Sequence, residues 1–280
     1  MSHVFDALRK SQKSVGDQPY VSPEAFLETL EKTRDLKEVP IERVDIFPES
    51  RIVVSTDPHS LGAERFRVLR TRLRELRAGG KLKTLLLTSP LPRDGKSTVA
   101  LNLATVLADQ EDSTVLLLEA DLRRPFLGQQ LQLKASPGLA ECLEQGFDPL
   151  SAIRRIEPLR FYLLPAGKPV ANPLALLQSQ RFSKLIQDLA DYFHWILIDS
   201  PPVSPVADTL ALKAHIDGTL LVVRARVTPR DAMEEAVKHF EPGQVIGLIL
   251  NGADGLDRSY SQYYRHEPRD NSQSGTKQRK

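Results

Sequence analysis

The stretch TLLLTSPLPRDGKSTVA, residues 84–100, decides the fold of this chain. It begins with an apolar, strand-like run, continues through a proline-containing loop, and starts an amphipathic helical pattern at Lys96. A strand, a loop that ends in Gly-Lys-Ser and a helix are the arrangement of a phosphate-binding loop. The usual motif opens with a glycine, but counting back from Gly95 reaches Pro90, so the neighbouring sequence has to support this interpretation.

The rest of the chain repeats the same alternation of short apolar runs and helical patterns. The runs are apolar almost throughout, which is typical of strands covered on both faces. Alternating strands and helices predict a doubly wound α/β domain with a mostly parallel sheet. The predicted strands are residues 84–89, 114–120, 161–166, 195–200, 218–225 and 245–251.

Composition limits the possible functions. The 280 residues are 41% hydrophobic and 26% charged, as in ordinary globular proteins, and a formal net charge of +2 gives no general attraction to nucleic acid. The single cysteine, Cys142, excludes an internal disulfide and favours a reducing cytoplasm, where we expect it to pack as a small apolar residue. No apolar run is long enough to span a membrane, and no signal peptide is evident, so any membrane attachment would need another component.

The chain divides into three parts. Residues 1–50 form a predicted N-terminal arm that is partly helical, with Ser22 as a helix cap. Residues 51–253 form the main domain, which includes an arginine-rich helix at about 60–77. Residues 254–280 are polar and lack an apolar period, which predicts a disordered tail.

In its context the loop has the chemistry of a phosphate cradle. Backbone N–H groups at a helix N-terminus point at the anion, Lys96 neutralises its charge, and the Ser97 hydroxyl can ligate Mg²⁺. The alternative is an ordinary strand, turn and helix with an exposed lysine. The residues assigned to nucleotide binding in the loop are Arg93, Asp94, Gly95, Lys96, Ser97 and Thr98.

Carboxylates at two strand ends support the nucleotide interpretation. Asp199 ends an apolar strand, in the position of the acidic residue that holds Mg²⁺ through water in phosphate-loop proteins. Glu119 and Asp121 end another, where they could orient Mg²⁺ or accept a proton from an attacking hydroxyl. The alternative makes these carboxylates strand-end caps or partners of Arg123 and Arg124.

These motifs resemble those of the bacterial tyrosine autokinases of exopolysaccharide and capsule synthesis. SPLPRDGKST (89–98) is similar to the family's Walker A motif, LLLEADLRRP (116–125) to its Walker A′ motif, and ILIDSPPV (196–203) to its Walker B motif. The resemblance covers about residues 50–265. Septum-site (MinD) and plasmid-partition (ParA) ATPases share the single motifs, so the resemblance implies a P-loop NTPase of the deviant-Walker group.

The resemblance implies an ATP- and Mg²⁺-dependent protein-tyrosine kinase. Lys96 and the loop amides would stabilise charge on the transferred γ-phosphoryl group. The implied metal-binding residues are Ser97, Asp121 and Asp199. Asp121, helped by Glu119, would orient the metal and accept the tyrosine proton, and the implied catalytic set is Lys96, Glu119, Asp121 and Asp199. Asn251 could contact the adenine edge, as in related ATPases, or simply form a turn before Gly252.

Two residues depart from the family pattern. The absent first glycine is common in the family, but Arg93 stands where a glycine is usual, and Glu119 replaces the first aspartate of the Walker A′ motif. Arginine adopts a positive φ less easily than glycine, which predicts a reshaped loop or altered nucleotide contacts. The longer Glu119 side chain predicts a shift in metal or proton-acceptor geometry.

The tail and the arginine-rich helix carry two further expectations. Family members have a tyrosine cluster in the tail that a neighbouring subunit phosphorylates, which assigns this role to Tyr260, Tyr263 and Tyr264; the alternative is a solvated tail whose tyrosines do nothing. The helix contains E-x-x-R-x-x-R, which in the family builds a ring-shaped oligomer. The motif residues are Glu64, Arg67 and Arg70, which lie near one face of the helix. The alternative is that this face is simply exposed to solvent.

The resemblance also implies partners. A membrane-embedded polysaccharide co-polymerase would be anchor and activator, holding the kinase at the inner face of the cell membrane, and a tyrosine phosphatase would reverse the modification. Cycles of phosphorylation would regulate polysaccharide polymerisation and export. The alternatives are a MinD- or ParA-like ATPase switch without tyrosine phosphotransfer, and a nucleotide-binding scaffold without catalysis.

Overall fold

A computed structural model of the chain describes residues 36–80, 82–110, 113–134, 136–205 and 207–253. The chain divides into two compact units, Met1–Glu38 and Val39–Lys280. Of the first unit only the 3-10 helix η1 (Leu36–Glu38) is described, so the helix expected from Ser22 lies outside the described residues. The predicted tail, with Tyr260, Tyr263 and Tyr264, also lies outside them.

The second unit is built on an eight-stranded sheet with the strand order β1-β4-β5-β3-β6-β2-β7-β8. Within this sheet, every neighbouring pair is parallel except β4 with β5. The predicted α/β fold with a mostly parallel sheet is therefore confirmed. The strands are β1 (Ile41–Arg43), β2 (Thr84–Thr88), β3 (Val115–Glu119), β4 (Arg154–Glu157), β5 (Phe161–Leu164), β6 (Trp195–Asp199), β7 (Gly218–Arg224) and β8 (Val245–Asn251).

All six predicted apolar runs form strands, whereas β1 and β4 were not predicted. Both are short, and their sequences, IER and RRIE, contain charged residues in place of a continuous apolar run. β1 is the edge strand of the sheet and pairs with β4. Near this edge the strands are less buried, so charged side chains can reach solvent. Residues 41–43, which the sequence placed with the N-terminal arm, thus belong to the sheet.

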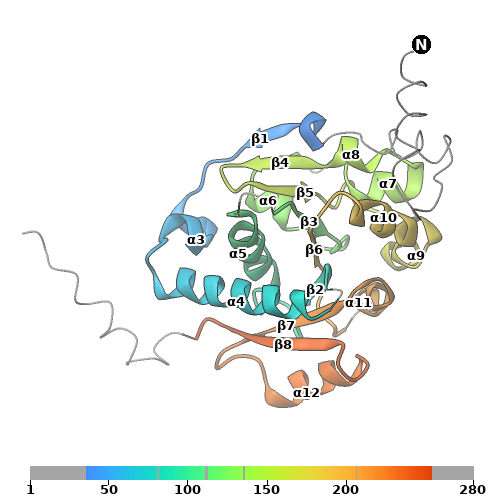
Figure 1. Cartoon of the computed structure of the whole chain (residues 1–280). Coiled ribbons are helices and arrows are strands. Elements are labelled where there is room, and N and C mark those ends of the chain that lie inside the picture. The colour runs from blue at the N-terminus through green and yellow to red at the C-terminus, as the bar shows by residue number, and fades with distance from the viewer. Residues whose placement is uncertain (1–35, 81, 111–112, 135, 206, 254–280) are drawn as a thin grey trace, which may run out of the picture. The chain divides into compact units, whose positions relative to one another are not determined.

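Helices cover both faces of the sheet. Figure 1 shows α3, α4 and α5 on one side of the strands, and α7, α9 and α10 on the other. The predicted arginine-rich helix is α4, which Ser60 caps by accepting a hydrogen bond from the Ala63 N–H. The helices are α3 (Val53–Thr56), α4 (Leu61–Ala78), α5 (Lys96–Ala108), α6 (Leu127–Gln130), α7 (Leu139–Gln145), α8 (Pro149–Ala152), α9 (Pro173–Leu177), α10 (Gln180–Ala190), α11 (Asp208–Leu212) and α12 (Arg230–Lys238), with short 3-10 turns η2 (Pro48–Ser50) and η3 (Lys213–His215).

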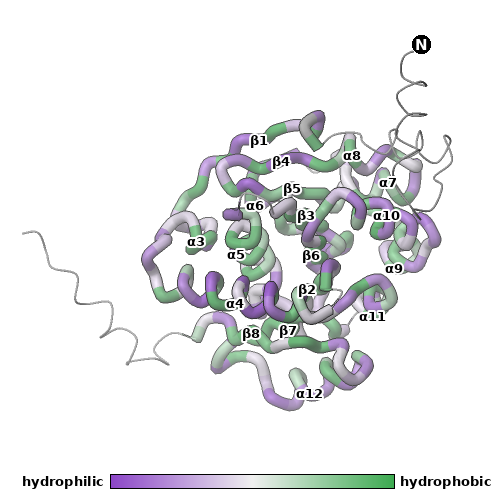
Figure 2. Tube along the Cα trace, in the orientation of Figure 1, coloured by the Kyte–Doolittle hydropathy of each residue, from purple (hydrophilic) through white to green (hydrophobic). Residues whose placement is uncertain are grey.

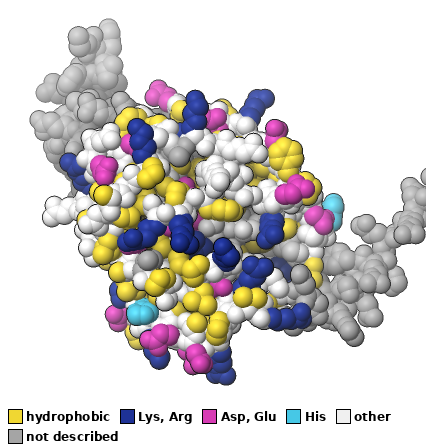
Figure 3. Space-filling view, turned by 180° about the vertical axis from the view of Figure 1, so that it is seen from behind, with side chains coloured by type: hydrophobic (Ala, Val, Ile, Leu, Met, Phe, Trp, Pro, Cys, Tyr) yellow, Lys and Arg dark blue, Asp and Glu magenta, His cyan; other side chains and the backbone are white. Residues whose placement is uncertain are grey.

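The central strands and α5 form the core. Every residue of β2, β3 and β6 is buried, and Figure 2 shows hydrophobic residues along these strands and along α5. Burying one leucine contributes roughly 1.5–3 kcal/mol, so this core fixes the strands firmly. On the face seen in Figure 3, side chains of both charge signs lie among apolar ones.

The topology determines where a site can form. β6 lies between β2 and β3, and Asp199 pairs in register with Leu87 on one side and with Glu119 on the other. Because these three strands are parallel, their carboxyl ends meet at one edge of the sheet, where ligands bind in open α/β folds. The loop after β2 reaches the same edge and leads directly into α5.

Candidate nucleotide-binding site

The loop between β2 and α5 turns through two residues with positive φ. Gly95 has a φ of 95° and precedes the first residue of α5, Lys96. A Cβ atom on Gly95 would lie 2.0 Å from the Asn251 side-chain nitrogen, so only glycine fits there. Arg93 has a φ of 70°, and it therefore takes the left-handed conformation that glycine would adopt more easily.

Lys96 lies among the predicted metal-binding residues. Its Nζ atom is 3.4 Å from Asp121 Oδ2 and 3.4 Å from Ser97 Oγ. The side chain is only 16% exposed, so its charge is weakly screened by water. The Asp121 Oδ1 atom accepts a hydrogen bond from the Arg124 N–H at 3.0 Å, which fixes the orientation of the carboxylate.

Asp199 is buried at the carboxyl end of β6. It is 1% exposed, and within the described part of the chain neither of its carboxylate oxygens accepts a hydrogen bond. Burial raises the pKa of Asp199 to about 7; the charge of Lys96 and the nearby Ser97 hydroxyl oppose the rise, and the carboxylates of Glu119 and Asp121 add to it. A buried carboxylate of this kind is costly unless it binds something, and a hydrated cation is a suitable partner.

Glu119 has contacts that the sequence did not predict. Its Oε1 atom accepts hydrogen bonds from the N–H groups of Phe126 and Leu127 at the start of α6, and its Oε2 atom accepts one from Ala166 at 3.1 Å. Burial raises its pKa, while these backbone hydrogen bonds oppose the rise. Both oxygens are therefore occupied in holding α6 and the segment after β5, and the longer glutamate side chain serves backbone contacts in this structure.

Asn251 lies against the phosphate-binding loop. At the end of β8, its Nδ2 atom donates to the Asp94 carbonyl oxygen at 2.9 Å. The amide thus contacts the loop backbone, whereas the sequence left open an adenine contact or a turn. The Asp94 side chain is 2% exposed and accepts hydrogen bonds inside the protein, so its contribution to the site is to hold the loop.

Three residues around this site were not predicted from the sequence: Asp208, Arg224 and Thr228. Arg123 forms a bidentate ion pair with Asp208, which is completely buried at the start of α11. This pair joins the segment after β3 to the segment after β6. Arg224, the last residue of β7, and Thr228, four residues further on, contact the phosphate-binding loop. Their position at or just after the carboxyl end of a predicted parallel strand is the sequence signal that could have identified them.

The predicted oligomer residues lie on α4, away from this loop in sequence. Glu64 and Arg67 form an ion pair of 3.0 Å and are about one-third exposed. Arg70 is less exposed and donates to the Val106 carbonyl oxygen at 3.0 Å, which joins α4 to α5 within the same chain. An interface on this face would therefore depend chiefly on the first two residues.

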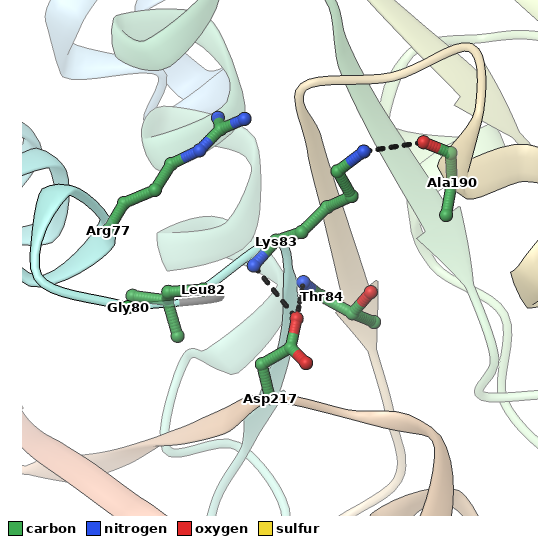
Figure 4. A pocket seen from close by; sticks show the side chains of 7 residues that line it. All are labelled: Arg77, Gly80, Leu82, Lys83, Thr84, Ala190 and Asp217. Carbon is green, nitrogen blue, oxygen red and sulfur yellow. Dashed lines mark hydrogen bonds between the residues drawn. The ribbon is translucent and has the colours of Figure 1, made fainter. Parts of the chain in front are cut away.

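A cavity of about 370 Å³ lies at the opposite end of β2, where the strand begins. Figure 4 shows Asp217 accepting hydrogen bonds from the N–H groups of Lys83 and Thr84, at 2.8 and 2.7 Å, while Lys83 Nζ donates to the Ala190 carbonyl oxygen. Arg77, which also lines the cavity, stacks over the Trp195 ring at 4.9 Å. These contacts hold the start of β2 and lie apart from the candidate site.

The residues at the carboxyl edge fit a nucleotide with Mg²⁺. The start of α5 offers backbone N–H groups and Lys96 to phosphate, while Ser97, Asp121 and Asp199 supply the oxygen atoms that Mg²⁺ prefers. Within the described ranges, no group of three or more His, Cys, Asp and Glu side chains is placed to hold a metal ion. Magnesium would therefore be held jointly by these residues, water and the nucleotide.

The fold and this edge together define the class of protein: a P-loop nucleotide-binding protein of the deviant-Walker group. The cell-division ATPase MinD of Pyrococcus furiosus has the same fold, with a TM-score of 0.52 over 60% of this chain and 71% of that one, at 22% identity. The kinase domain of the Escherichia coli tyrosine kinase ETK superposes with a TM-score of 0.69 over 80% of this chain and 86% of that one, at 26% identity.

Sequence comparison identifies the family. No family model matches the chain. The tyrosine-protein kinase CpsD of Streptococcus agalactiae is 31% identical over 210 residues, which are 74% of this chain and 90% of CpsD. The succinoglycan biosynthesis transport protein ExoP of Rhizobium meliloti is 33% identical over 213 residues, 73% of this chain. The chain belongs to the bacterial tyrosine-protein kinases of capsule and exopolysaccharide synthesis.

Relatives of this family differ in length. The chain spans 26% of ExoP and 30% of the tyrosine-protein kinase ptk of Acinetobacter johnsonii, to which it is 30% identical over 78% of its own length. In the part of the chain that the structure describes, no helix is long and apolar enough to cross a membrane.

Proposed function

We propose that this chain binds Mg-ATP at the carboxyl edge of β2, β3 and β6 and transfers the γ-phosphoryl group to tyrosine. The acceptors are Tyr260, Tyr263 and Tyr264 in the tail of a neighbouring copy. Family membership supports the reaction class. The tail residues lie outside the described part of the chain, so their role rests on the sequence alone.

One observation carries the nucleotide proposal. The Asp199 carboxylate is buried at the centre of the edge with neither oxygen hydrogen-bonded in the described part of the chain, next to Lys96 and across from Glu119. A protein keeps such a group at a cost unless a ligand uses it, and functional sites are where such groups collect. Magnesium held through water would give both oxygens a partner.

Each residue at the edge has a defined contribution. Bound Mg-ATP supplies the phosphoryl group, with Mg²⁺ reducing the charge repulsion against an incoming tyrosine oxygen. The loop N–H groups and Lys96 would stabilise negative charge on the phosphates, and Ser97, Asp121 and Asp199 would hold the metal. Asp121 also accepts the proton from the tyrosine hydroxyl. Glu119, whose oxygens accept three backbone hydrogen bonds, supports this edge from behind.

The biological setting is part of the same proposal. The name of ExoP places that relative in polysaccharide biosynthesis and transport. By analogy, this chain works at the inner face of the cell membrane through a membrane-embedded co-polymerase, which activates it, and a tyrosine phosphatase removes the phosphate. Copies assemble into a ring through the face of α4 that carries Glu64, Arg67 and Arg70.

A second function has weaker support. The fold likeness to MinD is also compatible with an ATPase switch in which no tyrosine is modified. Such a protein would hydrolyse ATP and leave its tail unmodified. The family match to tyrosine-protein kinases favours phosphotransfer.

Lys96→Met tests the proposal. Removing the ammonium group should lower autophosphorylation with Mg-ATP by at least a hundredfold, because the transferred charge loses its main neutralising group. Incorporation of labelled phosphate measures the effect. Lys184→Met is the matched control, since Lys184 is 76% exposed on α10 and pairs with Asp188 at the surface. Equal labelling of the Lys96→Met protein and the wild type would contradict the proposal.

A further inference from the structure

The phosphate-binding loop needs an external restraint. Arg93 holds a φ of 70° without being glycine, a conformation that is unfavourable for a residue with a Cβ atom. Gly95 follows with a φ of 95°. A loop with two left-handed residues keeps this shape only if its surroundings determine it, so the contacts of residues 93–95 decide whether the N–H groups point at a ligand.

A chain of hydrogen bonds ties the side chain of Asp94 to the segment after β7. The Asp94 Oδ2 atom accepts from the Leu91 N–H at 3.0 Å, within the loop. Its Oδ1 atom accepts from the Thr228 hydroxyl at 2.7 Å. That hydroxyl in turn accepts from the Arg224 N–H at 2.8 Å, so its proton is directed at Asp94.

The loop backbone is tied to the same region. Arg224 Nη1 donates to the Arg93 carbonyl oxygen at 3.2 Å, and Asn251 Nδ2 donates to the Asp94 carbonyl oxygen at 2.9 Å. Consecutive loop residues are thus held from the ends of two neighbouring strands, β7 and β8. Carbonyl oxygens bound in this way face β7 and β8, which leaves the N–H groups that begin α5 for the phosphates.

We infer that Thr228 is a positioning residue for nucleotide binding: its hydroxyl holds Asp94 and so keeps the loop in the shape that receives the phosphates of a nucleoside triphosphate. The inference rests on the proposed nucleotide function of this loop and extends it to a residue outside the motif. Arg93 is tolerated in place of glycine because the network supplies the restraint that the sequence lacks. A preformed loop binds more tightly, since binding does not have to order it.

Thr228→Val removes the hydroxyl and keeps the shape. Loss of this hydrogen bond should weaken the binding of Mg-ATP about tenfold, and Thr228→Ser should restore most of it. The Michaelis constant for ATP should rise more than the maximal rate falls, because Thr228 does not contact the reacting atoms. Calorimetric titration with ATP measures the affinity of each variant.

Thr105→Val is the matched control. The Thr105 hydroxyl donates to the Leu101 carbonyl oxygen at 2.8 Å within α5, so its loss changes the helix and not the loop. Amide exchange of residues 93–96 in the nucleotide-free protein supplies an independent measurement, and it should be faster in Thr228→Val and unchanged in Thr105→Val.

The outcomes separate the inference from the proposed function. Wild-type affinity and unchanged loop exchange in Thr228→Val would overturn the inference and leave the proposed function standing, as would failure of Thr228→Ser to restore binding. A wild-type protein that binds no ATP would contradict the proposed function, while the exchange measurement would still test whether Thr228 holds the loop.

Discussion

At the scale of single residues, Asp199 stands out because its charge is buried next to Lys96 and yet its pKa is raised to about 7. The carboxyl group therefore loses more from burial than it gains from the nearby ammonium group. In the unfolded chain the same group has an ordinary pKa near 4. The folded, metal-free protein thus binds a proton at Asp199 in a pH range where the unfolded chain does not.

This difference fixes the sign of the pH dependence. A group whose pKa is higher in the folded protein than in the unfolded chain stabilises the fold most at a pH below its pKa in the unfolded chain. This stabilisation is lost as the pH rises through its pKa in the folded protein. Asp199 therefore makes the metal-free protein less stable as the pH rises from about 4 to about 7.

Asp199→Asn should remove this dependence. At pH 8 with a chelator present, the variant should melt about 5 °C above the wild type, and the gap should shrink towards pH 5. Thermal denaturation followed by circular dichroism measures both midpoints. Asp121→Asn is the control, since it removes a carboxylate paired with Lys96 and should lower the midpoint. An Asp199→Asn protein that melts at or below the wild type at pH 8 would count against a costly buried charge.

Residue identities predicted much of the site but not its contacts. The carboxylates Glu119, Asp121 and Asp199 could be placed at one edge because each follows an apolar parallel strand. The sequence could not show that Glu119 turns towards the backbone of α6, because that depends on a four-residue helix with no periodic signal. The contact between Thr228 and Asp94 joins residues 134 positions apart, which no local pattern reveals.

At the scale of secondary-structure elements, the Glu119 side chain holds the start of α6. This helix is four residues long, too short to be stable alone, and Glu119 accepts hydrogen bonds from its first N–H groups. The same carboxylate holds the segment after β5 through Ala166. Glu119 thus joins two elements behind the candidate site.

Glu119→Gln should destabilise the protein even without a nucleotide. The glutamine amide would place a donor against backbone N–H donors, which leaves buried groups unsatisfied at a cost of about 1–3 kcal/mol. Urea denaturation of the nucleotide-free protein measures the loss of unfolding free energy. Glu144→Gln, at an exposed position on α7, should have almost no effect. An unchanged midpoint for Glu119→Gln would show that the side chain serves ligand chemistry and not the fold.

Strand prediction at this scale succeeded where burial is complete. β2, β3, β5, β6 and almost all of β7 are buried, so their apolar composition reports their environment. The apolar run of β8 was also predicted correctly, although this strand is only partly buried and Leu248 and Leu250 are about half exposed. β1 and β4 are held by pairing with their neighbouring strands, and both contain charged residues. Their pairing is set by the tertiary fold, which the local sequence does not encode.

At the scale of the whole molecule, the parallel sheet brings together segments that are far apart in the chain. The phosphate-binding loop, the acidic segment at the end of β3 and Asp199 at the end of β6 meet because β2, β6 and β3 are neighbours in the sheet. Arg123 and Asp208 fasten two of these segments together. The site is therefore a product of topology, and the proposed function additionally requires a tail from another copy to reach it.

Transfer between two defective copies tests the central claim most directly. The acceptor is a Lys96→Met chain with its tail intact, and the donor is a chain in which Tyr260, Tyr263 and Tyr264 are changed to phenylalanine. The two are mixed with Mg-ATP and the cytoplasmic segment of a co-polymerase, and phosphate is mapped by peptide mass spectrometry. Phosphotyrosine in the tail of the Lys96→Met chain, only when the donor is present, is the predicted result. Turnover of ATP by the donor with that tail unmodified would contradict the account and favour the ATPase switch.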